Sequence, residues 1–318
     1  MSFYLEKLWL NAIFDYDIKK LLERVRMNLV ITQNAQLKKY NTLRLQAIAQ
    51  TLYTPLNMQG VLEALQLAKG KRIVLLGNGS NVLFAKPFYD DSYAFIVTNR
   101  LDDLDISDGE LVVESGVKLH DLAWFAIDHQ IGGYEFCEDI PGTVGGALIM
   151  NAGQWEYTIG QYVNWVDVVD IDQQQVIRIT PDDQFFSYRH SKFENLNVII
   201  VRAGLTMPPG DYDDIFDRML EFKRERYKKQ PRNYPNAGSV FKRPYKNGES
   251  LFVWKLFDDV NIRGHRIGGA MISPKHPGFI INVDHASCDD CNQLIAEAQR
   301  RVKEQFDIDL ELEWKVID

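Results

Sequence analysis

Two glycine-rich segments have the composition of loops that bind phosphate or a cofactor. The first, residues 77–81, directly follows the apolar run Arg72–Leu76. Its glycines let successive backbone N–H groups approach an anion. The segment lacks the last glycine of a dinucleotide fingerprint, because that position holds Val82, and no Gly-Lys-Ser/Thr triplet of a P-loop follows. A phosphate-binding loop and a plain turn are both open for this segment.

The second segment, residues 139–153, combines the rigid Pro141 with four glycines. Such a stretch exposes many backbone N–H and C=O groups, and its ordering costs entropy unless a ligand or a close backbone contact stabilises it. The composition predicts a cofactor contact. A purely structural glycine-rich crossover is the alternative.

Two polar side chains lie in local contexts that favour chemistry. Arg189 follows Tyr188, and its planar guanidinium suits a carboxylate, although a surface arginine is the simpler interpretation. Ser239 follows Ala237-Gly238, which indicates a positioned rather than a merely solvated hydroxyl. The Gly-x-Ser-x-Gly elbow of acyl-transfer enzymes is missing, which argues against a serine nucleophile.

Charged residues near the C-terminus allow both a functional and a structural interpretation. The last apolar run is predicted as a strand over 310–317, and alternation along it puts Glu311 and Glu313 on one face. A polar face exposed to solvent explains both glutamates without any catalytic role. A basic cluster stands out in this acidic chain: Lys223, Arg224, Arg226, Lys228, Lys229 and Arg232. It fits a solvated helix face or the rim of a diphosphate site.

Cys288 and Cys291 have the spacing of a redox or zinc pair. A zinc site needs four ligands, and the sequence holds no second cysteine pair to complete one. Cys291 continues the apolar face of the following residues, and Ser287 is a natural N-cap. We therefore expect the start of a structural helix and no metal site.

The elements that must position these residues are strands and helices in an irregular order. Short β-type runs predominate between residues 31 and 203, and helical patterns cover 119–129, 215–227 and the stretch after Ser287. We predict an α+β fold with a helical lead-in over residues 1–30, one domain over 31–203 and a second over 204–318.

Composition and charge restrict the class of protein. The chain has 318 residues, 46% hydrophobic and 25% charged, which is typical of a globular protein long enough for two domains. Its net charge of −8 argues against a nucleic-acid partner. No run approaches the length of a membrane span, and the N-terminus lacks a signal-peptide pattern. We expect a cytoplasmic protein without a membrane partner.

Taken together and in this order, the motifs resemble the UDP-N-acetylenolpyruvoylglucosamine reductase family. The segments that carry the resemblance are 77–83, 140–153, 188–193, 235–244, 266–270, 278–284 and 310–313. The most specific are Ile-Pro-Gly-Thr-Val-Gly-Gly and the later Ala-Gly-Ser-x-Phe-Lys. The resemblance runs from about residue 70 to the C-terminus.

The resemblance implies a fold, cofactors and a substrate. The fold is a two-part FAD-binding domain of the vanillyl-alcohol-oxidase (PCMH) type followed by a smaller α/β substrate-binding domain, in the compact form without the tyrosine-loop insertion. The cofactor is FAD, the co-substrate is NADPH, and the substrate is a UDP-linked amino-sugar enolpyruvyl ether. A monomer or weak dimer is expected.

The resemblance also implies roles for individual residues. Arg189 and Glu313 would polarise the substrate carboxylate, and Ser239 would donate a proton to C2. The flavin would contact Gly77, Asn78, Gly79, Ser80, Asn81, Ile140, Pro141, Gly142, Thr143, Gly145, Gly146 and Asn151. The substrate would contact Tyr188, Lys223, Asn236 and Lys242.

Several positions depart from the family pattern. Residues 41–47 lack a usual Gly-Gly pair, residues 154–157 replace the usual Ala-Tyr-Gly, and Glu138-Asp139 stands where small neutral residues are common. These departures leave two alternatives to the reductase. One is another FAD-dependent oxidoreductase on the same scaffold, and the other is a non-catalytic paralogue that binds flavin or a UDP-sugar.

Overall fold

The described chain, residues 27–318 of this computed structural model, begins with a five-stranded sheet. Its strands are β1 (Leu29–Gln36), β2 (Ile48–Pro55), β3 (Arg72–Leu76), β5 (Phe88–Tyr89) and β6 (Tyr93–Val97). The order is β1-β2-β6-β3, with β5 beside β2. β1 and β2 are antiparallel, whereas β6 lies parallel to both β2 and β3. Helix α2 (Met58–Leu67) supplies the crossover from β2 to β3 that parallel strands require.

A second five-stranded sheet follows and is antiparallel throughout. Its strands are β7 (Leu104–Ser107), β8 (Glu110–Glu114), β11 (Val163–Asp170), β12 (Val176–Ile179) and β15 (Val198–Leu205), in the order β12-β11-β15-β8-β7. Leu111 and Val113 alternate with less buried neighbours along β8, so one face of the strand enters the core. Helices α3 (Leu119–Asp128) and α4 (Val144–Met150) pack in that core.

Short elements fill the connections around this second core. Two hairpins are formed by β9 (Gly153–Gln154) with β10 (Tyr157–Thr158) and by β13 (Phe186–Ser187) with β14 (His190–Ser191). The 3-10 turns are η1 (Leu37–Tyr40), η2 (Glu135–Cys137), η3 (Ile159–Tyr162) and η4 (Lys192–Asn195).

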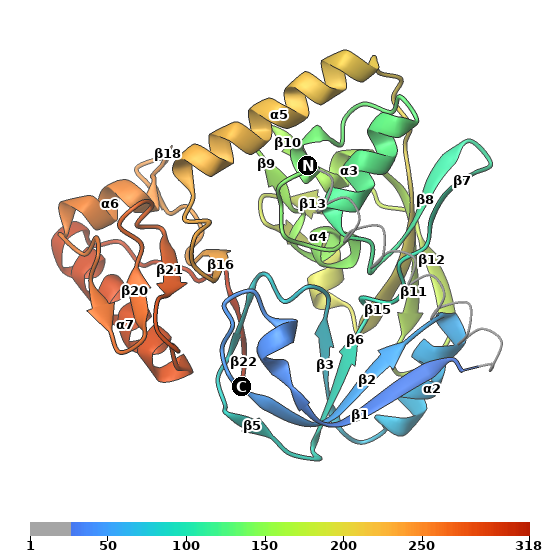
Figure 1. Cartoon of the computed structure of the whole chain (residues 1–318), viewed down its shortest axis with the longest axis horizontal. Coiled ribbons are helices and arrows are strands. Elements are labelled where there is room, and N and C mark those ends of the chain that lie inside the picture. The colour runs from blue at the N-terminus through green and yellow to red at the C-terminus, as the bar shows by residue number, and fades with distance from the viewer. Residues whose placement is uncertain (1–26) are drawn as a thin grey trace, which may run out of the picture.

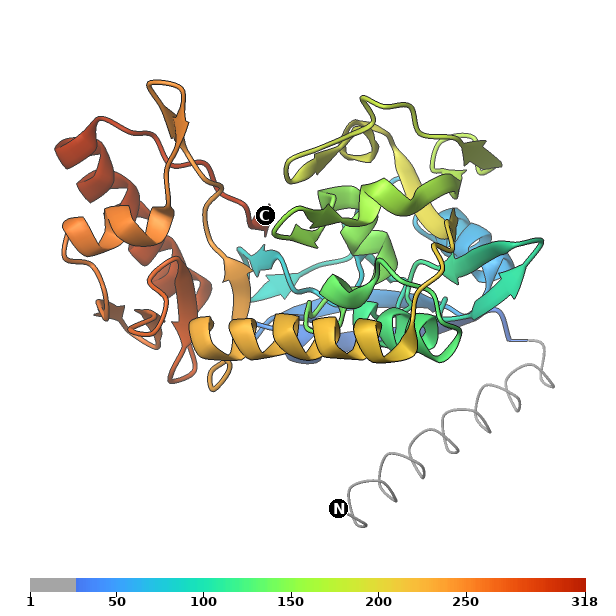
Figure 2. The same ribbon diagram turned by 90° about the horizontal axis from the view of Figure 1, so that it is seen from above.

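The long helix α5 (Tyr212–Lys229) carries the chain across to the C-terminal part (Figures 1 and 2). Asp211 caps its N-terminus by accepting hydrogen bonds from the backbone N–H groups of Asp213 and Asp214. Ile215 and Phe222 on its inner face are buried in the core of the second sheet. Helix α5 therefore packs along one side of the first half of the molecule through these apolar residues.

The C-terminal part packs two helices, α6 (Val253–Asp259) and α7 (Cys288–Phe306), into one core with a four-stranded sheet. The sheet order is β16 (Asn236–Ser239), β21 (Phe279–Asn282), β20 (Ala270–Ile272) and β19 (Arg266–Ile267). A small hairpin of β17 (Tyr245–Lys246) and β18 (Glu249–Ser250) projects from it. Ser287 caps α7 in a capping box with Asp290, and Cys291 is buried on the inner face, as the sequence predicts.

The last strand ties the two halves together. β22 (Lys315–Ile317) pairs in parallel with β4 (Val82–Phe84), directly after the first glycine-rich loop. In turn, Leu43, Leu45 and Leu83 of the first half are buried in the C-terminal core. The halves thus share both hydrogen bonds and apolar packing.

The element boundaries agree closely with the sequence for strands 72–76 and 110–114. The proposed domain limit at 203/204 lies inside β15. Residues 1–26 of the expected helical lead-in lie outside the described residues, and the prediction was wrong for Leu29 and Val30, which belong to strand β1 through its pairing with β2. The terminal strand is shorter than expected, since only its end, β22, is hydrogen-bonded as a strand. No helix among residues 27–318 combines the length and apolarity that would be needed to cross a membrane.

Candidate active site

A cavity of about 570 Å³ lies where the two halves meet. One side is lined by residues 75–82 and 139–143, the other by residues 230–232 and 234–239, and the C-terminal segment contributes Glu313, Lys315 and Ile317. The crossing of β22 beside β4 brings these distant segments together.

The two glycine-rich loops touch each other at the cavity. Asn78 Nδ2 donates to the carbonyl of Pro141 at 2.7 Å. A Cβ on Gly77 would lie 2.4 Å from Thr143 Oγ1, so a larger residue there would have to displace this hydroxyl. Gly79 has φ +62°, and a Cβ there would lie 2.0 Å from the carbonyl oxygen of Tyr40. Glycine is therefore required at residue 79, and at residue 77 it preserves the close contact with Thr143.

Thr143 gives these loops an unfilled hydrogen-bonding position. Thr143 lines the cavity, and its Oγ1 is buried without a hydrogen-bond partner. A buried hydroxyl without a partner costs free energy, which a polar ligand atom at this point would recover. The glycine-bounded wall with this hydroxyl beside it fits the phosphate and ring atoms of a flavin nucleotide.

Most residues that the sequence assigned to the flavin line this cavity. They are Gly77, Asn78, Gly79, Ser80, Asn81, Ile140, Pro141, Gly142, Thr143 and Gly146. Gly145 and Asn151 do not line it. Gly145 lies against Ser115, whose carbonyl accepts its backbone N–H at 2.8 Å. Asn151 ends α4 in the left-handed conformation with φ 44°.

Asn151 instead holds the hairpin that carries Arg189. Its Nδ2 donates to the carbonyl of Ser187 at 2.9 Å, and its Oδ1 accepts from the N–H of Gly160 at 3.0 Å. Ser191 Oγ adds a bond to the carbonyl of Ile149 at 2.8 Å. The polar side chains therefore anchor both strands of the hairpin to the end of α4.

Arg189 occupies the two-residue turn between β13 and β14 and has φ 53°, an uncommon value for a residue other than glycine. Its Nε lies 3.1 Å from Glu313 Oε1, and its Nη2 donates to the carbonyl of Gly153 at 3.1 Å. Side chains in strained turns are often held there by function. Here the turn directs the guanidinium into the cavity.

Glu313 is fixed by its backbone and buried by its surroundings. Its N–H donates to the carbonyl of Val240 at 2.8 Å, and its carbonyl accepts from Asn81 Nδ2 at 2.9 Å. Burial raises the pKa of the Glu313 carboxyl, against the opposing influence of the Arg189 guanidinium. Glu313 and Glu311 do not share a solvent face, because the chain is not a regular strand there; the Glu311 side chain is 73% exposed and that of Glu313 only 16%.

Ser239 ends β16 opposite Phe279 and lines the same cavity. Gly238 before it has φ +77°, a conformation that glycine adopts without strain. The structure thus brings Arg189, Ser239 and Glu313 to one cavity, together with the two glycine-rich loops.

Of the residues that the sequence assigned to the substrate, Asn236 lines the cavity and three others do not. Lys223 Nζ lies 2.6 Å from Glu138 Oε1, outside the cavity. Lys242 Nζ lies 2.7 Å from the exposed Glu311. The half-exposed Tyr188 packs beside Arg189, whose guanidinium lies 5.3 Å from the ring centroid.

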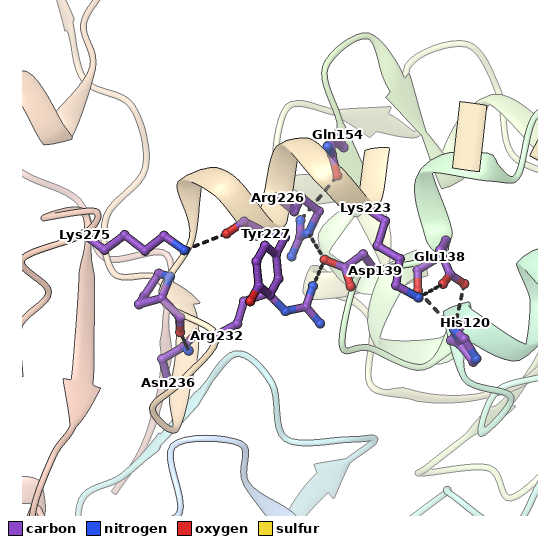
Figure 3. Close-up of polar contacts among 11 residues, drawn as sticks. His120, Glu138, Asp139, Gln154, Lys223, Arg226, Tyr227, Arg232, Asn236 and Lys275 are labelled. Atoms are coloured by element: carbon purple, nitrogen blue, oxygen red, sulfur yellow. Dashed lines mark hydrogen bonds and ion pairs between the residues drawn. The ribbon is translucent and has the colours of Figure 1, made fainter. Parts of the chain in front are cut away.

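Sequence reasoning missed an ionic cluster on the cavity wall (Figure 3). Arg226 Nε donates to Asp139 Oδ2 at 3.1 Å, and Arg232 Nη1 binds the same oxygen. All three residues line the cavity. The sequence singled out Arg226 and Arg232 as members of the basic cluster at 223–232, but nothing in it indicated that they contact Asp139.

Family comparisons cover both halves of the chain. An FAD binding domain model matches residues 49–180, and a model described as UDP-N-acetylenolpyruvoylglucosamine reductase, C-terminal domain, matches residues 230–317. These matches agree with the α+β fold of a two-part FAD-binding domain followed by a smaller domain, which is confirmed.

Relatives and a solved structure agree with these models. The chain is 38% identical over 285 residues to a UDP-N-acetylenolpyruvoylglucosamine reductase of Caldicellulosiruptor bescii, covering 88% of each chain. It is 32% identical to that of Staphylococcus aureus, covering 95% of this chain and 96% of the relative. The crystal structure of the reductase from Thermus caldophilus superposes with a TM-score of 0.74 and 29% identity, over 92% of this chain and 100% of that one. The chain belongs to the UDP-N-acetylenolpyruvoylglucosamine reductase family.

Proposed function

We propose that this protein reduces the enolpyruvyl ether of UDP-N-acetylglucosamine to UDP-N-acetylmuramate with NADPH, using FAD. The family membership and the FAD-binding domain support this activity. The reaction adds a hydride to C3 and a proton to C2 of the enolpyruvyl double bond. It is a step in the synthesis of a peptidoglycan precursor.

The cofactor would be held by the two glycine-rich loops. Gly77 and Gly79 let the first loop pack closely against Thr143 and Tyr40 at the edge of the cavity, and Thr143 Oγ1 offers its unpaired hydrogen-bonding capacity. Bound FAD supplies the hydride, which it receives from NADPH. Asn78 keeps the two loops in register through its bond to Pro141.

Arg189 would bind the carboxylate of the substrate. An enol ether is electron-rich and accepts hydride only when charge is drawn into the adjacent carboxylate. A guanidinium held in advance stabilises the negative charge that develops there. Glu313 orients this guanidinium through the 3.1 Å contact, and its raised pKa lets it hold a proton near the carboxylate more readily than an exposed glutamate.

Ser239 would protonate C2. A serine hydroxyl is a weak acid in water, but the enolate left after hydride addition is a strong base, so a correctly positioned hydroxyl suffices. Ser239 is carried on a hydrogen-bonded strand rather than a free loop, which supports such positioning.

The single observation that carries the proposal is one cavity lined by Arg189, Ser239, Glu313 and the loop of Thr143. A charged carboxylate site, a proton donor and a cradle for a cofactor are the parts that hydride addition to an enolpyruvyl group requires.

The deciding experiment compares the two half-reactions in Ser239→Ala. We expect NADPH to bleach the flavin absorbance at the wild-type rate, because hydride transfer to the flavin does not use this hydroxyl. Oxidation of the reduced flavin by the enolpyruvyl substrate should fall by about 10²-fold or more. Ser250→Ala, in the exposed hairpin of the same half, is the matched control.

Three outcomes would contradict the proposal. Loss of both half-reactions together would assign Ser239 a structural role. Turnover of a different carboxylated substrate in preference to the enolpyruvyl UDP-sugar would indicate another flavoenzyme. Purified protein that carries flavin but oxidises no NADPH would indicate a non-catalytic paralogue.

A further inference from the structure

Arg189 lies in the turn of a hairpin that is too short to be stable alone. β13 and β14 contribute two residues each and pair at two positions. Two-stranded hairpins are marginally stable in water even when they are longer. The value of φ 53° at Arg189 adds strain, which persists only where surrounding groups hold the residue. The place of the guanidinium therefore depends on contacts that the hairpin makes with the rest of the molecule.

Two parts of the molecule provide such contacts. Asn151 and Ser191 tie the hairpin to the end of α4. Arg189 Nε ties it to the C-terminal segment through Glu313 Oε1 at 3.1 Å. This second tie uses the guanidinium that must also bind the carboxylate of a substrate. A tie to the same segment that does not involve Arg189 would keep the hairpin in place while the guanidinium engages its ligand.

Glu194 makes a tie of this kind. It lies in η4, the 3-10 turn that directly follows β14. Its Oε2 lies 3.1 Å from Nδ1 of His190, the residue after Arg189. Its Oε1 lies 3.2 Å from Nζ of Lys315, two residues after Glu313. One carboxylate therefore connects the hairpin to the C-terminal segment, beside the contact between Arg189 and Glu313.

Burial gives the contact between Glu194 and Lys315 its strength. The Glu194 side chain is 16% exposed, and within residues 27–318 its Oε1 is buried and accepts no hydrogen bond. Taking a carboxylate out of water costs free energy unless hydrogen bonds or an opposite charge compensate. The Lys315 ammonium supplies that charge. Separation of the two groups would leave a buried anionic oxygen uncompensated, so the contact resists displacement of the hairpin.

The backbone of Lys315 is fixed to the first glycine-rich loop. Its N–H donates to the carbonyl of Asn81 at 2.9 Å, and it pairs with Val82 in β4. Asn81 Nδ2 in turn donates to the carbonyl of Glu313 at 2.9 Å. Lys315 and Glu313 thus share one support. Any movement of the hairpin away from Lys315 also moves Arg189 relative to Glu313.

We propose that Glu194 is a positioning residue, which through His190 and Lys315 holds the Arg189 guanidinium in place while it binds the substrate carboxylate. The inference deepens the proposed function and rests on it. Neither Glu194 nor His190 lines the cavity, so Glu194 acts through Arg189 rather than on the ligand. Small displacements of a catalytic group have large effects on rate, because the reacting geometry is narrow.

The test follows the two half-reactions in FAD-loaded wild type, Glu194→Gln and Lys315→Met. We expect both variants to slow the maximal rate at which the enolpyruvyl substrate oxidises the reduced flavin by about tenfold. Reduction of the flavin by NADPH should keep the wild-type rate. Lys315→Arg retains the cation and should recover most of the rate that Lys315→Met loses.

A double variant separates positioning from a general structural role. In the Arg189→Ala background, Glu194→Gln should cause no further loss of rate, because the group through which it acts is already gone. Lys192→Met is the matched control. Lys192 lies in the same 3-10 turn, and its ion pair with Asp182 at 2.9 Å joins two exposed side chains of the first half. Its removal should leave both half-reactions unchanged.

Hydrogen exchange gives a readout that does not depend on turnover. In the FAD-loaded protein, the backbone amides of residues 186–191 should exchange faster in Glu194→Gln than in wild type or Lys192→Met. The difference should also be present in Lys315→Met and be much smaller in Lys315→Arg.

The inference is overturned if Glu194→Gln slows the wild type and Arg189→Ala by the same factor, since it would then act independently of the guanidinium. It is overturned as well if rate and exchange in Glu194→Gln match those of Lys192→Met. A wild type whose reduced flavin is not oxidised by the enolpyruvyl substrate would reject the proposed function instead. Exchange in the hairpin would then still decide whether Glu194 holds Arg189.

Discussion

Two aspartates in this molecule each gather two arginines, in very different surroundings. Asp139 lies on the cavity wall with Arg226 and Arg232. Asp167 lies in β11 of the second sheet, where its Oδ1 accepts from Arg178 Nε at 2.7 Å and its Oδ2 from Arg202 Nε at 2.9 Å. Both carboxylates are 5% exposed.

The two clusters differ in how far their arginine side chains are exposed to solvent. Arg178 and Arg202 are 51% and 47% exposed, so water and salt neutralise their excess charge. Arg178 also stacks 3.6 Å from the centroid of Trp165, which occupies its face. Arg226 is 17% exposed and faces a cavity. Asp167 thus holds two exposed arginines on the surface, where Glu110 adds a second negative charge near Arg178, whereas Asp139 holds Arg226 at the wall of a cavity.

The largest difference between variants of the cavity and variants of the Asp167 cluster should be in the rate of turnover. Arg189→Ala removes the guanidinium proposed for the substrate carboxylate, and we expect kcat to fall by about 10²–10³-fold. Arg178→Ala removes an arginine of the surface cluster and should leave kcat at the wild-type value. The measurement is NADPH oxidation that depends on the enolpyruvyl substrate. Equal losses in the two variants would abolish the distinction.

The next effect is on stability. Asp139→Asn leaves two cations at the cavity wall without a counter-charge, one of them well buried, and should lower the free energy of unfolding by about 2–3 kcal/mol. Asp167→Asn leaves cations that water can solvate, and about 1 kcal/mol is expected. Urea unfolding of both variants measures the two losses. A greater loss for Asp167→Asn would reverse the comparison.

The stability contributed by the Asp167 cluster should depend on pH in the acidic range. Burial acts to raise the pKa of Asp167, but its bonds to Arg178 and Arg202 outweigh burial and the pKa is lowered. A carboxyl with a lowered folded pKa stabilises the protein above its unfolded value of about 3.9, and the contribution disappears as pH falls through the folded pKa. The difference between wild type and Asp167→Asn in urea midpoint should therefore shrink on acidification. A constant difference would show that charge is not its source.

Substitution of Glu313 should have the smallest effect on stability, and its dependence on pH should be opposite to that of Asp167. Its pKa is raised, so the linked stability is fully present below the unfolded value of about 4.3 and is lost as pH rises through the folded pKa. Glu313→Gln should therefore unfold at a slightly higher urea concentration than wild type at neutral pH, and this gain should fade below about pH 4. Arg189 retains the carbonyl of Gly153 as an acceptor. A variant less stable than wild type at neutral pH would show that the ion pair outweighs burial.

Local features of the sequence predicted much of the fold and many of the residues that line the cavity. The apolar run Arg72–Leu76 followed by glycines predicted a strand and a sharp loop, because both depend on neighbouring residues alone. The N-cap predicted at Ser287 is local in the same way, and the structure adds Asp290 to it as the second half of a capping box. Unusual local contexts likewise drew attention to Arg189 and Ser239, which the structure brings to one cavity.

Only the tertiary structure separated Lys223 from Arg226. Spaced three residues apart on α5, they lie near one another on the helix surface, so the sequence offers no basis for choosing between them. Their partners, Glu138 and Asp139, are 85 and 87 residues away in the chain. The docking of that loop against α5 decided which cation reached the cavity.

The burial of Glu313 also depends on the tertiary structure. Alternation along 310–317 predicted one exposed face for Glu311 and Glu313, yet hydrogen bonds to Val240 and Asn81 hold Glu313 inside. Residue type and spacing determine what a side chain can donate or accept. Its pKa, its charge balance and its access to a ligand depend on the groups that surround it, and these come from segments far apart in the chain.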